Sequence, residues 1–161
     1  MHGWMSKILR VNLVNGKSTV ESLDPMVAKN YIGGRGLGIY YLNQEVDPKI
    51  EPLSPDNLLV MATGPLTGTG APTGARYMVM TKSPLTGAAG ESEAAGFFGP
   101  ELKKAGFDAI VFQGKSEKPV YLWVNDGKAE LKDATELATL STRALEDAIR
   151  DEMGSAKIRV A

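Results

Sequence analysis

Two glycine-rich stretches interrupt the middle of the chain and constrain most strongly how it can fold. They run over residues 64–77 and 81–99, and both contain the tetrapeptide Pro-Leu-Thr-Gly, which begins at Pro65 and again at Pro84. Each copy is expected to form a turn that leaves a strand end exposed. Small side chains let the backbone approach a large flat or anionic ligand, and free N–H groups can cradle phosphate. The alternative is that both stretches are simple glycine-rich loops.

The segments around these stretches carry apolar residues at strand or helix spacing. Asn15-Gly16 predicts a two-residue hairpin turn, and Asp24-Pro25 predicts the start of a helix that ends at Gly33-Gly34. Strands are expected over Lys7–Val14, Ser18–Leu23, Leu58–Ala62, Arg76–Thr81, Asp108–Phe112, Val120–Val124 and Lys128–Leu131. Helices are expected through Val27, Ala28 and Tyr31, and over Leu37–Val46, Pro100–Ala105 and Thr142–Met153.

This order of elements indicates a β-rich α+β domain, because the regular β-α-β alternation of a doubly wound fold is missing. With 161 residues, the chain suits one domain or a piece of a larger one. The last residues, Lys157–Ala161, look like the beginning of a strand. We therefore expect residues 1–161 to be the N-terminal part of a longer protein, with the domain truncated at its C-terminal end.

The chain has no cysteine and one histidine, His2. Within these residues, this composition excludes a disulfide framework, a thiolate nucleophile, a cysteine-bound zinc or iron–sulfur cluster and a Ser-His-Asp triad. A formal net charge of −1 gives no general electrostatic reason to bind nucleic acid or anionic lipid. No apolar run is long enough for a signal peptide or a membrane span. We expect a cytoplasmic protein without nucleic-acid or membrane partners.

Several charged or glycine-rich positions are candidate site residues. The segment GGRGLG at residues 33–38 does not fit the dinucleotide-binding fingerprint, because the residues before it look helical. Arg76 follows small residues and precedes a predicted strand, so its guanidinium can reach over a ligand and donate paired hydrogen bonds. Composition alone favours the alternative that Arg76 is an ordinary solvated arginine on the surface. Glu91, Glu93 and Glu101 lack the spacing of paired acid–base carboxylates and fit better as solvated charges, or as a helix N-terminal charge for Glu101.

Longer motifs then follow one another along most of the chain. They read GGRGLG, LSPDNLLVMATGPLTGTGAPTGARY, TKSPLTG, GFFGPELKKAGFDAIVFQGKSEKPVYL and LKDAT. Together, from Trp4 to Ala161, they resemble the N-terminal domain of the aldehyde ferredoxin oxidoreductase family. The resemblance implies an α+β domain of two similar halves, which forms the base for a tungsten bis-pterin cofactor, tungstopterin.

The resemblance also implies an activity and its partners. Members of this family oxidise small aldehydes to carboxylic acids and transfer the electrons to ferredoxin through a 4Fe–4S cluster. Two further, mainly helical domains bring the cluster cysteines near the metal, which agrees with the lack of cysteine here. The implied partners are the remaining domains of the same enzyme, ferredoxin and a small aldehyde, together with a possible homo-oligomer.

The resemblance assigns cofactor contacts to four residues and no catalytic side chain to this chain. Arg76 matches the family arginine between pterin and cluster, and Glu93, Ala94 and Ala95 match a pterin-contacting loop that often reads Asn-Ser-Gly. This chain departs from that pattern at all three loop positions. In the family, the first of them offers its main-chain carbonyl to a magnesium ion that joins the two pterin phosphates. Glu93 can keep that role, but its carboxylate repels phosphate unless a cation screens it.

Three functional hypotheses remain open from the sequence. The first is the cofactor-binding base of an aldehyde:ferredoxin oxidoreductase, inactive as this chain alone. The second is a related tungsten enzyme that reduces an aromatic acyl-CoA. The third is a non-catalytic module that kept the fold and lost the cofactor.

Overall fold

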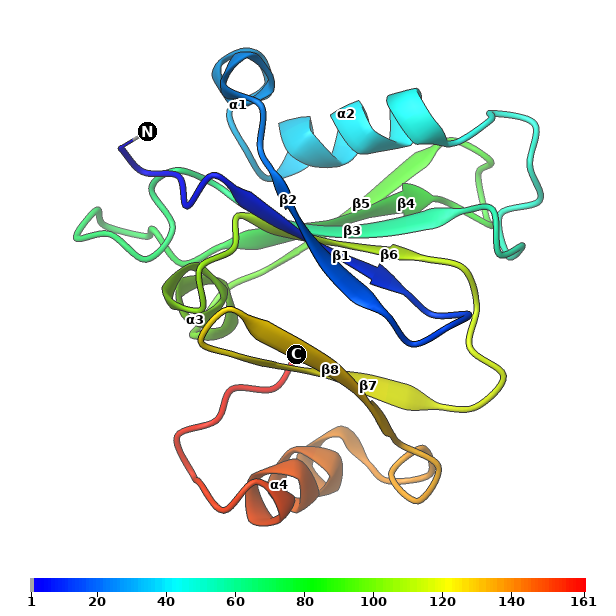
Figure 1. Ribbon diagram of the computed structural model, residues 1–161, viewed down its shortest axis with the longest axis vertical. Coiled ribbons are helices and arrows are strands. Elements are labelled where there is room, and N and C mark those ends of the chain that lie inside the picture. The colour runs from blue at the N-terminus through cyan, green and yellow to red at the C-terminus, as the bar shows by residue number, and fades with distance from the viewer. Residues whose placement is uncertain (1) are drawn as a thin grey trace.

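A mixed six-stranded sheet runs through the centre of the molecule in the order β2-β1-β6-β3-β4-β5, and a second sheet pairs β7 with β8 (Figure 1). The computed structural model describes residues 2–161. The strands are β1 (Lys7–Asn12), β2 (Ser18–Ser22), β3 (Leu58–Thr63), β4 (Tyr77–Lys82), β5 (Ala89–Ala94), β6 (Ala109–Gln113), β7 (Val120–Asn125) and β8 (Lys128–Asp133). The helices are α1 (Pro25–Tyr31), α2 (Arg35–Glu45), α3 (Phe98–Lys104) and α4 (Thr142–Glu152).

The helices and the small sheet lie on both sides of the large sheet. Helices α1 and α2 lie on one side, whereas α3, the β7–β8 hairpin and α4 lie on the other (Figure 1). The predicted α+β class is confirmed, and the strands form two sheets of different size. The two similar halves implied by the resemblance stay a prediction. Within residues 2–161, no helix is long and apolar enough to cross a membrane.

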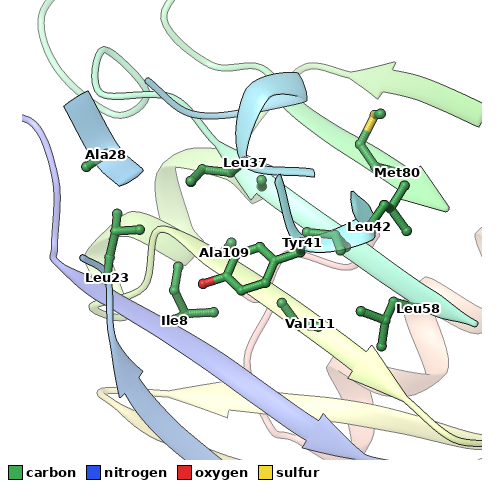
Figure 2. Close-up of a cluster of buried hydrophobic side chains, with 12 residues drawn as sticks. Ile8, Leu23, Ala28, Leu37, Tyr41, Leu42, Leu58, Met80, Ala109 and Val111 are labelled. Atoms are coloured by element: carbon green, nitrogen blue, oxygen red, sulfur yellow. The ribbon is translucent and has the colours of Figure 1, made fainter. Parts of the chain in front are cut away.

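Successive side chains of the central strands point to opposite faces of the large sheet, and apolar residues occur on both faces. In β1, Ile8 packs into a cluster on the α2 side, whereas Leu9 and Val11 pack into a cluster on the α3 side. Strand β1 runs parallel to β6 and antiparallel to β2. Such central strands, buried on both faces, read as nearly continuous apolar runs. Figure 2 shows the first cluster, which includes Leu37 and Tyr41 of α2 and Val111 of β6.

The first hairpin has a longer loop than its sequence predicted. Strand β1 ends at Asn12 rather than Val14, because the Asn12 side chain accepts hydrogen bonds from the backbone N–H groups of Val14 at 2.9 Å and Asn15 at 3.2 Å. Asparagine commonly stops a strand in this way. Gly16 adopts a positive φ of 71° in the loop, as the turn prediction required.

Strand β5 was not predicted, because its sequence AGESEA lacks the apolar alternation of a buried strand. It forms because β4 offers an open edge, and Lys82 to Tyr77 pair in order with Ala89 to Ala94. The second Pro-Leu-Thr-Gly copy makes the connecting turn, in which Gly87 has a φ of 69° and its N–H donates to the Ser83 carbonyl at 2.9 Å.

The prediction of a strand at Lys157–Ala161 is wrong. These residues pair with no strand of residues 2–161 and have no regular structure. The guanidinium of Arg150, on α4, donates instead to the Ile158 carbonyl at 3.2 Å. The apolar alternation of these five residues is therefore not accompanied by pairing with any sheet edge. Helices α2 and α3 also begin earlier than predicted, at Arg35 rather than Leu37 and at Phe98 rather than Pro100.

Candidate functional site

A hollow of about 430 Å³ opens where the start of α2, the end of β3 and the first glycine-rich stretch meet. Small-molecule sites commonly have volumes of about 300–1,000 Å³. Its charged lining residues are Arg35 and Arg76. The uncharged ones are Ile32, Gly33, Gly34, Ala62, Gly64, Leu66, Thr67, Pro72, Thr73, Gly74 and Met78. The hollow thus combines apolar and backbone walls with two cationic side chains.

Close approach between backbone segments builds one wall of this hollow. A Cβ atom on Gly33 would lie 2.7 Å from the Thr63 carbonyl oxygen and 2.8 Å from the Gly64 Cα. A Cβ atom on Gly74 would lie 2.6 Å from the Leu66 carbonyl oxygen. Real side chains do not tolerate such distances, so these positions require glycine. Glycine at these two positions thus allows backbone segments to lie against each other. The predicted close approach of backbone to a ligand stays a prediction.

Thr67 fastens the glycine-rich stretch to the residue that precedes β4. Its side-chain oxygen accepts a hydrogen bond from the Gly64 N–H at 3.1 Å and donates one to the Arg76 carbonyl at 3.0 Å. The residue is only 6% exposed. Because a threonine hydroxyl can donate and accept at once, one side chain holds both ends of the stretch. The Arg76 side chain therefore projects from a backbone position that Thr67 holds in place.

Two arginine–glutamate ion pairs stand beside the hollow. Arg76 pairs with Glu93, and Arg35 pairs with Glu91. The two arginine side chains are 56% and 59% exposed, and both carboxylates are 40% exposed. Exposed pairs of this kind contribute about 0–1 kcal/mol to stability. They therefore contribute little to the stability of the fold.

The structure brings the sequence-predicted site residues together at one end of β5. Glu93 lies opposite Met78, and Ala94, the last residue of β5, lies opposite Tyr77. Ala95 follows directly and is exposed, as Ala94 is. Arg76, Glu93, Ala94 and Ala95 thus share one edge of the sheet. Their roles toward a cofactor, and the Glu93 carbonyl as a magnesium ligand, stay predictions.

Sequence reasoning missed Arg35 and Thr67 and did not pair Glu91 with an arginine. Arg35 lies in the GGRGLG segment, from which the sequence predicted no site residue. The usable signal was the spacing of Glu91 and Glu93, because residues two apart in a strand point to the same face. Glu101 behaves as expected, since it forms an exposed surface pair with Lys104 on α3 at 2.8 Å.

The ionisable groups near the hollow do not form a metal or acid–base centre by themselves. Among residues 2–161, no three His, Asp or Glu side chains converge as metal ligands. Burial raises the pKa of Tyr77, which stacks on Phe98 with ring centroids 5.1 Å apart. Tyr77 therefore stays protonated at neutral pH. The site can bind and orient a ligand, and its reactive chemistry has to come from that ligand.

A larger hollow of about 1120 Å³ lies on the other side of the large sheet, between it, the β7–β8 hairpin and the C-terminal residues. Its lining is mainly apolar and includes Leu59, Phe98, Phe112 and Leu122. The predicted site residues and both arginine–glutamate pairs lie elsewhere. The hollow is large because the β7–β8 hairpin and the C-terminal residues cover this apolar face of the large sheet only in part, and not because polar groups converge there.

Comparison with known proteins agrees with the observed fold. Residues 8–161 match the family model of the aldehyde ferredoxin oxidoreductase N-terminal domain. The chain belongs to this family.

Individual relatives match over the whole chain. It is 50% identical over 161 residues to the tungsten-containing aldehyde ferredoxin oxidoreductase of Pyrococcus furiosus and 48% identical to that of Pyrococcus abyssi. All of this chain is covered, against 27% and 26% of those proteins, so the chain spans about a quarter of their length. The solved active-site complex BamBC of benzoyl-coenzyme A reductase with 1,5-dienoyl-CoA contains a similar chain, with a TM-score of 0.94 and 37% identity. That match covers 97% of this chain and 24% of the other.

Proposed function

We propose that this chain is the cofactor-binding base of a tungsten-dependent oxidoreductase that oxidises aldehydes to carboxylic acids, with ferredoxin as the electron acceptor. The observation that carries the proposal is the 50% identity over all 161 residues to an enzyme named for this activity. The rest of the enzyme, ferredoxin and a small aldehyde are the proposed partners, in the cytoplasm and with a possible homo-oligomer. The chain alone is proposed to be inactive.

The residues beside the hollow suit a tungstopterin. Arg76 supplies a planar guanidinium with several N–H donors for a pterin edge or a phosphate. Glu93, Ala94 and Ala95 offer backbone groups at the exposed end of β5, and Glu93 is the proposed main-chain ligand for a magnesium ion. When bound, the tungsten centre and its sulfur ligands would supply the redox chemistry. A 4Fe–4S cluster would need ligands from outside this cysteine-free chain.

Among these residues, Glu93 is the least favourable for binding a tungstopterin, because its carboxylate repels the cofactor's phosphates. Its ion pair with Arg76 already compensates that charge. The backbone carbonyl of Glu93 remains a possible ligand whatever its side chain does, because main-chain coordination does not depend on residue type. This chain's residues are therefore compatible with a bis-pterin whose phosphates are screened by cations.

In this function, the chain binds and orients rather than reacts. Gly33, Gly64 and Gly74 line the hollow and present no side chain to a ligand. Thr67 fixes the backbone from which Arg76 projects. The guanidinium of Arg76 carries a positive charge that can balance negative charge on a ligand.

The test replaces Arg76 in the full-length protein that carries this chain. Arg76→Ala should lower tungsten and pterin content per chain, because the loss of a charge-assisted hydrogen bond costs about 1.5–3 kcal/mol. Arg76→Lys should give an intermediate content, because it restores the charge without the planar fork. Arg143→Ala, at an exposed position on α4, is the matched control. Full cofactor content and full dye-linked aldehyde turnover in Arg76→Ala would contradict the assignment.

A second candidate is reductive chemistry on an aromatic acyl-CoA. The structural match to the benzoyl-coenzyme A reductase complex favours it, although the sequence identity of 37% is lower than the 50% to the aldehyde enzyme. Assays of the full-length protein with aldehydes and an oxidised dye, and with benzoyl-CoA and a strong reductant, separate the two. Turnover only with the acyl-CoA would replace the first proposal by the second.

A further inference from the structure

Each charged side chain that lines the smaller hollow already has a partner of opposite charge. Arg35 and Arg76 line the hollow, and Glu91 and Glu93 hold them from just outside it. The formal charges of these four side chains sum to zero. A hollow with two cationic groups at its wall is therefore less attractive to anions than its arginines alone suggest.

Three separate segments create this arrangement. Arg35 is the first residue of α2, Arg76 directly precedes β4, and both glutamates belong to the edge strand β5. Glu91 lies opposite Met80 and Glu93 opposite Met78. Met80 packs in the cluster beneath α2, so both carboxylates point to the α2 side of the sheet. Strand geometry thus directs two negative charges toward the two arginines.

We propose that Glu91 and Glu93 are internal competitors for anions at Arg35 and Arg76, and that they determine which ligands the hollow accepts. A ligand phosphate must displace a carboxylate or share its guanidinium against repulsion. A ligand group that is neutral, or whose charge is compensated by a cation, meets no such opposition. The proposal also makes Arg35 a second ligand-contacting arginine. It rests on the proposed function in one respect, that the hollow is the ligand site.

Inorganic pyrophosphate is a suitable probe, because it carries phosphate charge without a pterin. Its binding is measured by titration calorimetry at low ionic strength, with the full-length protein free of cofactor. Glu91→Gln and Glu93→Gln should each tighten binding about two- to fivefold, since an exposed ion pair is worth up to about that factor. The double variant should gain about tenfold. Added salt should reduce the difference, because it screens exposed charges.

Two controls show whether the gain in pyrophosphate affinity depends on the two arginines. Glu101→Gln removes an equally exposed carboxylate that pairs with Lys104 on α3, outside the hollow, and should leave pyrophosphate affinity unchanged. Arg35→Ala and Arg76→Ala, each added to the double glutamine variant, should remove part of the gain. Glu93→Asn serves as a second variant at its position, and thermal unfolding verifies that every variant is folded.

The proposal is overturned if the double glutamine variant binds pyrophosphate no more tightly than the wild type, including the case in which neither binds. It is also overturned if the gain persists without both arginines. These outcomes are independent of the proposed function, whose test is tungsten and pterin content in Arg76→Ala. A protein that retains tungstopterin but fails the pyrophosphate test disproves this inference alone.

Discussion

At the scale of single residues, the two Pro-Leu-Thr-Gly copies show how surroundings decide the role of one side chain. Thr67, in the first copy, is buried and bridges the Gly64 N–H and the Arg76 carbonyl. Thr86, in the second copy, is exposed and accepts only a local hydrogen bond from the Ala88 N–H at 3.3 Å. Only the first copy therefore supports the candidate site.

Thr67→Val should destabilise the fold and displace Arg76. The half-buried Gly64 N–H and Arg76 carbonyl would lose their partner, which costs about 1–3 kcal/mol. Urea unfolding measures this loss, with Thr67→Ser expected to restore most of it. Thr86→Val is the matched control and should change the free energy of unfolding by less than about 0.5 kcal/mol. Equal effects at both threonines would contradict the bridging role.

A second residue-scale prediction concerns the buried ion pair between Lys103 and Asp108. The two side chains are 8% and 1% exposed, their charged atoms are 2.5 Å apart, and Lys103 also donates to the Gly3 carbonyl at 2.7 Å. Lys103→Met should destabilise the protein by about 3–5 kcal/mol, because it leaves a buried carboxylate unpaired. Lys104→Met, at the exposed neighbouring position, should have little effect on the unfolding midpoint. A small loss for Lys103→Met would show that Asp108 finds another partner.

At the scale of elements, α4 is attached to the small sheet partly through polar contacts. Its buried apolar residue is Ile149, while Glu152 near its end accepts a hydrogen bond from the Tyr121 hydroxyl of β7 at 2.8 Å. Lys132 of β8 lies 3.6 Å from the same carboxylate. The attachment of α4 should therefore depend on the protonation state of Tyr121.

Burial and the hydrogen bond to Glu152 raise the pKa of Tyr121 from 10.0 to about 12. A group with a raised folded-state pKa contributes stability that is complete below its unfolded pKa and is lost as pH rises through the folded value. The free energy of unfolding should therefore fall between about pH 10 and pH 12. Tyr121→Phe should flatten this fall, as measured by denaturant unfolding at a series of pH values. The same slope in both proteins would contradict the link.

At the scale of the whole molecule, the two sides of the large sheet differ in how well they are covered. The α2 side carries a cluster that includes Leu37, Tyr41 and Met80, all buried (Figure 2). The other side borders the 1120 Å³ apolar hollow. Leu53 and Leu59, which line that hollow, are 71% and 38% exposed.

Partial cover of this kind predicts association of the isolated 161-residue chain. Exposed contiguous apolar surface drives proteins to self-associate or to bind partners. Size-exclusion chromatography with light scattering should show species larger than the 17.2 kDa monomer, in proportion to protein concentration. Leu53→Ser with Leu59→Ser should reduce this association, whereas Val14→Ser, an exposed position outside the hollow, should not. A monodisperse wild-type monomer would contradict the prediction.

Much of the fold was predictable because local signals agreed with it. Alternating residues predicted β1, a short apolar run predicted β3, and strands were also expected at β6 and at both strands of the β7–β8 hairpin. The Asp24-Pro25 start of α1 is confirmed, with Asp24 accepting from the Met26 N–H at 2.7 Å. Strand β5 was missed because an edge strand needs no apolar face. The false strand at Lys157–Ala161 has the opposite cause, since apolar alternation cannot form a strand without a partner edge.

The sequence by itself determined the α+β class and the family, and the family resemblance indicated the candidate residues Arg76 and Glu93. Only the tertiary structure decided that Arg76 faces Glu93, that Arg35 faces Glu91, and that Thr67 rather than Thr86 supports the site. The physical reason is the distance along the sequence over which each kind of interaction acts. Turn and strand preferences act over a few neighbouring residues, whereas the charge and packing around a site come from segments that meet only when the sheet has formed.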